Sequence, residues 1–71
     1  MKRIWHYIND GEFPSYECTC LCRVKWGSNY RYITANFFAE GDWCSVESGD
    51  RITDSIEAWA DLNDVLERAG V

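Results

Sequence analysis

The residues with the clearest chemical potential are four cysteines, three of which alternate along one segment. Cys18, Cys20 and Cys22, together with Cys44, could supply four thiolates to a structural zinc ion. Residues two apart on an extended strand are separated by roughly 6.5–7 Å, whereas two sulfurs on one tetrahedral zinc ion lie about 3.8 Å apart. The spacing therefore favours reduced cysteines packed in a core. A zinc module, a disulfide or a redox role are the alternatives.

His6 is the only histidine and so the only imidazole available as a general base. A pair of His6 with a cysteine nucleophile is one conceivable enzymatic arrangement, although a histidine in a first strand is more typical of an edge or surface position. No phosphate-binding loop, dinucleotide fingerprint or calcium loop is present, and the twelve acidic residues single out no catalytic pair. We therefore expect no enzymatic activity, no cofactor and no metal.

Charge is unevenly distributed along the chain, whose net charge is −5. Residues 1–39 carry five basic and three acidic side chains, whereas residues 40–71 carry two basic and nine acidic ones. Because phosphate contacts need Lys and Arg, we expect no direct binding to nucleic acid. An acidic strip from Glu40 to Glu67 could instead dock onto a basic surface of another protein. The alternative is that these charges only keep the surface hydrated.

Aromatic residues around one expected hairpin are the second candidate for a contact surface, because aromatic side chains often anchor interfaces. They are Trp26, Tyr30, Tyr32 and Phe38. The alternative is that they pack under a C-terminal helix. The predicted protein-binding residues are Glu40, Asp42, Asp61, Asp64, Glu67, Tyr30 and Tyr32.

The start of the chain does not resemble a secretory signal, because few apolar residues separate Lys2 and Arg3 from the turn at Asn9-Asp10-Gly11. No apolar run approaches the ~20 residues of a membrane span. We therefore expect a cytoplasmic protein with reduced thiols and no membrane partner. A chain of 71 residues is expected to form a single small domain, residues 1–71.

Period-two alternation over residues 16–26 predicts the clearest strand, with an apolar face and a mostly polar face. The apolar face is expected to be core, and it carries Cys18, Cys20, Cys22, Val24 and Trp26. Residues 27–29 predict a hairpin turn, followed by a second strand over residues 30–39. Shorter strands are expected over residues 4–8 and 43–46. An open edge strand in so small a sheet would also allow a homodimer.

The C-terminal tail permits two interpretations. One is a single helix over residues 55–69, with Asp54 as its N-cap. The other is a strand over residues 55–59, followed by a helix from about Asn63 to Ala69 that ends at Gly70. The helical spacing of apolar residues favours the first.

Five short stretches of the chain resemble a family of small tryptophan-rich domains of unknown function found in bacteriophages, prophages and gut bacteria. The shared features are an early Trp with an apolar-Pro pair, a Gly-x-Trp triplet, and a late apolar-x-Ala-Trp-x-x-Leu segment. The matching stretches are residues 5–14, 20–22, 32–37, 41–43 and 56–62. The chain departs from the family at Ala60, where Pro is frequent, and in its tail over residues 63–69. The resemblance implies a strand over residues 56–59 and supplies no catalytic residues.

Together these patterns predict an α+β fold, a small antiparallel β-meander of three or four strands with a short C-terminal helix. Trp43, Trp59 and Leu66 are expected to close the core. The predicted function is a non-enzymatic protein-binding accessory domain, encoded by a phage or prophage as the resemblance implies. It would inhibit or modulate a host or phage protein that has a basic surface. A structural zinc module and a small ligand-binding domain are the alternatives.

Overall fold

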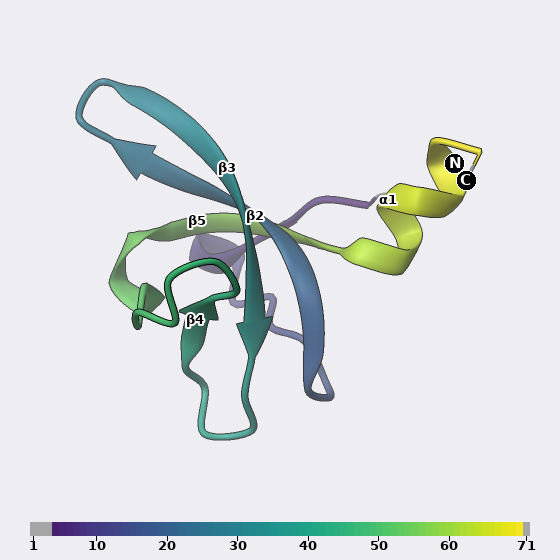
Figure 1. The fold of residues 1–71 in the computed structure, drawn as a ribbon, viewed down its shortest axis with the longest axis horizontal. Helices are drawn as coiled ribbons and strands as arrows, with labels where there is room; N and C mark the ends of the chain where they lie inside the picture. The colour runs from purple at the N-terminus through teal and green to yellow at the C-terminus, as the bar shows by residue number, and fades with distance from the viewer. Residues whose placement is uncertain (1–3, 71) are drawn as a thin grey trace.

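Five antiparallel strands form a single sheet in a computed structural model of the protein, which describes residues 4–70. The strands are β1 (His6–Tyr7), β2 (Cys18–Trp26), β3 (Asn29–Phe37), β4 (Trp43–Ser45) and β5 (Ile56–Asp61). Two short 3-10 turns, η1 (Ile8–Asp10) and η2 (Thr53–Ser55), precede the long β1–β2 loop and β5, and one helix, α1 (Leu62–Arg68), follows β5. The α+β class and the short C-terminal helix are therefore confirmed (Figure 1).

The strand order is β1-β5-β2-β3-β4, so the expected meander describes only part of the sheet. β2, β3 and β4 follow one another as neighbours, but β5 returns to pair with the other edge of β2. β1 then pairs with the outer side of β5. The prediction of three or four strands was thus too few, because it missed this return of the chain to the start of the sheet.

The long β2–β3 hairpin carries the predicted core face. Cys20 pairs with Ala35, and both are fully buried; Cys22 pairs with Ile33 and is also fully buried. The period-two interpretation is confirmed over this part of β2. It is wrong for Trp26, which pairs with Asn29 at the turn and is 63% exposed. The hairpin extends beyond the core there, so alternation continues while burial ends.

The sheet curls around its core instead of lying flat. Trp43 on β4 and Trp59 on β5 have ring centroids 6.1 Å apart, although β2 and β3 lie between their strands. In a flat sheet three steps between strands would separate them by about 14 Å. Both tryptophans are buried, as predicted, and Phe37 packs on Trp43 with ring centroids 4.8 Å apart. Curling thus lets β4 and β5 share one small core.

A bulge contributes to the bend where β2 meets β5. Arg23 pairs with Ala58, but the next residue, Val24, pairs with Ile56, so Glu57 is an extra residue on β5. An extra residue on one strand increases the local twist and bends the pair. The side chain of Glu57 lies 3.6 Å from Arg23 (Oε1 to Nε), which joins the two strands across the bulge.

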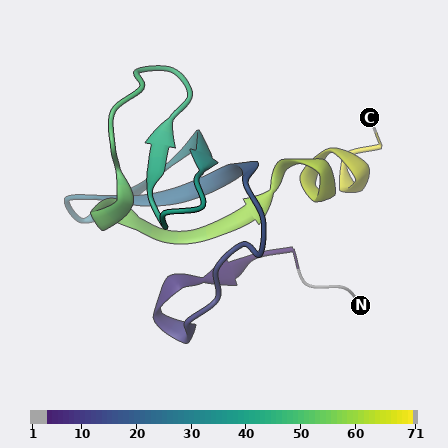
Figure 2. The same ribbon diagram turned by 90° about the horizontal axis from the view of Figure 1, so that it is seen from below.

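The second interpretation of the tail is confirmed, since β5 ends at Asp61 and α1 begins at Leu62. Asp61 acts as the N-cap, with its Oδ1 accepting a hydrogen bond from the backbone N–H of Asn63 at 2.8 Å. The expectation that Leu66 closes the core is wrong, because it is 40% exposed. Figures 1 and 2 both show α1 running away from the sheet at the end of β5. Among residues 4–70, no helix has the length and apolar character to cross a membrane.

Candidate functional site

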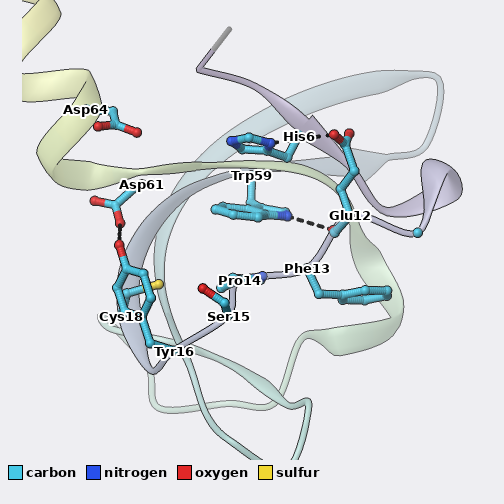
Figure 3. A pocket seen from close by; sticks show the side chains of 11 residues that line it. His6, Glu12, Phe13, Pro14, Ser15, Tyr16, Cys18, Trp59, Asp61 and Asp64 are labelled. Atoms are coloured by element: carbon cyan, nitrogen blue, oxygen red, sulfur yellow. Dashed lines mark hydrogen bonds and ion pairs between the residues drawn. The ribbon is translucent and has the colours of Figure 1, made fainter. Parts of the chain in front are cut away.

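A pocket of about 410 Å³ lies between the loop that precedes β2 and the end of β5 (Figure 3). Residues 11–16 of the loop form one side. The remaining lining residues are His6, Cys18, Trp59, Asp61 and Asp64. Segments that are more than forty residues apart in the sequence therefore meet here, as the hydrogen bonds below show.

Trp59 holds the loop in place from inside the pocket. Its indole Nε1–H donates a hydrogen bond to the backbone carbonyl of Glu12 at 2.9 Å. The imidazole of His6, which pairs with Trp59 across β1 and β5, stacks on the indole with ring centroids 4.4 Å apart. The Glu12 carboxylate in turn accepts a hydrogen bond from the Tyr7 N–H at 2.9 Å and lies 3.7 Å from His6 Nδ1. Contacts from β1 and β5 thus fix the position of Glu12, which lines the pocket.

Tyr16 and Asp61 close the other side of the pocket. The phenol of Tyr16 donates a hydrogen bond to Asp61 Oδ2 at 2.7 Å, while Asp61 Oδ1 caps α1. This hydrogen bond and the charge of Asp61 raise the pKa of Tyr16 to about 12. Tyr16 therefore remains a neutral donor at any physiological pH. Its hydrogen bond and that from Asn63 hold the nearly buried Asp61, which is 9% exposed, in one orientation.

The thiols of β2 are poor nucleophiles in this structure. Burial raises the pKa of Cys18 and of Cys20, and raises that of Cys22 to about 12. Because the thiolate is the reactive form, protonated thiols at neutral pH are inert. Cys18 lines the same pocket as His6, but the imidazole stacks on Trp59 and faces the Glu12 carboxylate. The arrangement does not favour a Cys-His nucleophile pair.

The four cysteines do not converge on one point. Cys20 and Cys22 lie on the core face. The sulfurs of Cys18 and Cys20 are close to each other, 3.4 Å apart, but Cys44 is not part of this group. Cys44 pairs with Asn36, next to the core pair of Trp43 and Phe37, so its side chain points to the opposite face of the sheet. Within residues 4–70, no group of three or more His, Cys, Asp or Glu side chains is placed to hold a metal ion.

The predicted acidic strip is divided between two parts of the molecule. Asp61 and Asp64 line the pocket, and Glu67 follows them on the exposed side of α1. Glu40 and Asp42 lie instead in the β3–β4 loop, where Asp42 Oδ1 accepts a hydrogen bond from Arg51 Nε at 2.9 Å. Figure 1 shows this loop and α1 at different ends of the sheet. The structure therefore brings together only Asp61, Asp64 and Glu67.

The predicted aromatic contact residues lie on the convex face of the β2–β3 hairpin, far from α1. Tyr30 and Tyr32 are 43% and 57% exposed, respectively. The guanidinium of Arg23 lies over the Tyr30 ring at 3.8 Å, and Trp5 contacts Tyr32 with ring centroids 5.9 Å apart. The interpretation that these rings pack under the helix is wrong, because α1 extends from the other end of the sheet (Figure 1).

The two edge strands, β4 and β1, differ in whether their backbone is open to pairing with another strand. β4 is covered by the chain that follows it, since Ile52 N–H donates to the Trp43 carbonyl at 2.8 Å and Ser45 N–H to that of Asp50 at 2.9 Å. β1 is the other edge strand and has only two residues. Homodimerisation through an edge strand stays a prediction, and β1 is the edge at which it would occur.

Sequence reasoning missed most of the pocket. It selected Asp61 and Asp64 but not Glu12, Phe13 or Tyr16, which come from the opposite wall. The available signal was that two of the tryptophan-containing stretches, residues 5–14 and 56–62, each also contain two acidic residues. Nothing in a single sequence states that these stretches are neighbours. Their pairing through β1 and β5 is what creates the site.

Comparison of the chain with models of known protein families, with curated protein sequences and with solved structures finds no match. The resemblance to the phage and prophage domains therefore stays a prediction.

Proposed function

We propose that this protein is a non-enzymatic accessory domain that binds another protein with a basic surface. The contact is made by the acidic end of the molecule, defined as Asp61 at the end of β5 and Asp64 and Glu67 on α1. The resemblance to phage and prophage domains supports a role as an inhibitor or modulator of a host or phage protein.

One observation carries this proposal: three acidic residues from separate segments line one pocket. Glu12 comes from the loop before β2, Asp61 from the end of β5 and Asp64 from α1. Among those of residues 4–70 that line the pocket, only His6 can carry a positive charge. Such a concentration of negative charge attracts basic partners and excludes acidic ones.

The chemistry of the cysteines supports a binding role over the two chemical alternatives. The raised pKa values of the β2 thiols disfavour a thiol enzyme. The position of Cys44 on the opposite face disfavours a four-cysteine zinc module. The pocket supports the other alternative, a small ligand-binding domain, because its volume falls in the range of small-molecule sites.

A charge-reversal experiment tests the proposal. The tagged protein is used to capture partners from a nuclease-treated lysate of its source at two salt concentrations. The double variant Asp64→Lys/Glu67→Lys is compared with Glu47→Lys/Asp50→Lys, which makes the same change in charge on the β4–β5 connection. Asp61 is left unchanged because it caps α1 and is buried.

We expect one stoichiometric protein partner that is released by high salt, lost with the first double variant and retained by the control. A partner retained equally by both double variants would show that the acidic end is not the contact surface. Binding that survives high salt would argue against an electrostatic contact.

A further inference from the structure

We propose that the pocket between the loop and β5 is a receptor for an alkylammonium group, the cationic end of a lysine side chain on the partner. This inference rests on the proposed function and names the group that the acidic end recognises.

Aromatic rings form much of the pocket wall. Phe13 and Tyr16 come from the loop, Trp59 comes from β5, and His6 stacks on the Trp59 indole. Figure 3 shows Tyr16 and Phe13 on the two flanks of the pocket with Pro14 and Ser15 between them. Phe13 and Tyr16 are 54% and 62% exposed, so they are accessible to a ligand. Aromatic faces attract cations within about 6 Å, and a lysine stem also benefits from apolar contact.

The carboxylates supply the charge that a cation needs. Each oxygen of Asp61 accepts one hydrogen bond, from Tyr16 or from Asn63, and a carboxylate oxygen can accept a second. Asp64 lies one turn further along α1, whereas the Glu12 carboxylate faces the Tyr7 N–H and His6 Nδ1 (Figure 3). The carboxylates of Asp61 and Asp64 are therefore the groups that a cation in the pocket would meet.

This arrangement favours an ammonium over a guanidinium group. A guanidinium binds a carboxylate best through two parallel hydrogen bonds to both oxygens in one plane. At Asp61 each oxygen already accepts a hydrogen bond from a different donor, so a guanidinium would have to fit both of its parallel bonds beside those of Tyr16 and Asn63. An ammonium is compact and has three donors that can be directed to separate acceptors. Lysine therefore fits the pocket better than arginine.

Titration with small probes tests this directly. Nα-acetyl-lysine methylamide, its Nε-trimethyl and Nε-acetyl forms, and the arginine equivalent are added to ¹⁵N-labelled protein at physiological salt. The signals followed are the Trp59 indole N–H and the backbone amides of residues 11–16 and 61–64. For a ligand of this size we expect half-saturation on the order of millimolar.

The expected result is a saturable shift with the lysine probe, a several-fold weaker response to the arginine probe and none to the Nε-acetyl form. Phe13→Leu, which removes an aromatic wall, should weaken lysine binding by about two- to fivefold. Asp64→Asn should weaken it as well. Phe38→Leu and Glu47→Gln serve as matched controls, because both residues lie outside the pocket lining and outside the acidic end, and they should bind as the wild type does.

Three results would overturn the inference: no saturable shift with lysine, equal responses to lysine and arginine, or unchanged binding in both Phe13→Leu and Asp64→Asn. The amide spectra of the variants show whether they are folded. If the lysine probe fails while the captured partner is still lost on charge reversal, only the receptor is refuted and the proposed function stands. If the probe binds but no partner depends on the acidic end, the proposed function is refuted and the pocket remains a small-cation site.

Discussion

The hydrogen bond between Tyr16 and Asp61 links two parts of the chain that are forty-five residues apart. It also joins the pocket to the helix, because the same carboxylate caps α1 through Asn63. Asp61 is nearly buried, so its charge needs these donors. A single carboxylate thus fixes the loop, the end of β5 and the start of α1 at the acidic end.

Removing this hydroxyl should change how stability depends on pH. The pKa of Tyr16 is raised from 10.0 to about 12, first by the hydrogen bond to Asp61. Between these values the unfolded chain loses the Tyr16 proton while the folded chain retains it, so stability falls as pH rises from about 10 to about 12. Below pH 10 the contribution is fully present.

We therefore expect the free energy of unfolding of the wild type to fall more steeply across this window than that of Tyr16→Phe. Urea denaturation at several pH values from 9 to about 11.5 measures the difference, and the titrations of all other groups are common to both proteins. Tyr32→Phe, which removes a hydroxyl from the exposed convex face, is the matched control for the substitution itself. Parallel curves for the wild type and Tyr16→Phe would contradict the assigned cause of the shift.

At the scale of single elements, the β2–β3 hairpin depends on the backbone of its turn. Gly27 has φ of +63°, and no residue other than glycine has a positive φ within residues 4–70. A two-residue turn with Gly at its first central position matches the twist of paired strands. A side chain at Gly27 would meet no atom within 4 Å, so the demand is on conformation and not on space.

Gly27→Ala should accordingly destabilise the protein by about 1–2 kcal/mol, the cost of a left-handed conformation for a residue with a Cβ. Ser28→Ala changes the neighbouring turn residue, which has no positive φ, and should alter stability by less than about 0.5 kcal/mol. Equilibrium unfolding in urea compares the two variants. Equal stability of the two variants would mean that the turn readily adopts another conformation.

Local patterns predicted the elements better than their pairing. The alternation of Cys18, Cys20 and Cys22 predicted β2 and its buried face, because a strand in contact with a core repeats every two residues. Side-by-side placement of β5 and β2 was not predicted, since it depends on contacts between residues far apart in the sequence. The pocket was missed for the same reason, because its walls belong to the two ends of the chain.

The errors at single residues have a common cause at the scale of the whole molecule. Trp26 and Leu66 both have the correct period for a core position, but both are exposed. The core is small, and the β2–β3 turn and α1 extend beyond it at opposite ends of the sheet (Figure 1). Periodicity indicates which way a side chain points, but only the extent of the neighbouring elements determines whether something covers it.

The whole fold depends on a few aromatic residues that close the curled sheet. Trp43 is 1% exposed and contacts both Phe37 and Trp59. Replacing a buried tryptophan by alanine costs about 3–5 kcal/mol, a large share of the total stability of roughly 5–15 kcal/mol that domains have. A chain of 71 residues lies near the lower end of that range, because small domains bury less of their surface.

Trp43→Ala should therefore lower the free energy of unfolding by about 3–5 kcal/mol and leave the protein at most marginally stable at 25 °C. Trp26→Ala, the same substitution at a side chain that is 63% exposed, should change the stability by at most about 1 kcal/mol. Far-UV circular dichroism during urea denaturation distinguishes the two, since it does not depend on tryptophan fluorescence. If Trp43→Ala instead unfolds at nearly the urea concentration of the wild type, β4 does not close the core. The fold would then depend on β1, β5, β2 and β3 alone. The contrast between two tryptophans on the same chain thus tests the curled sheet itself, independently of what binds at its acidic end.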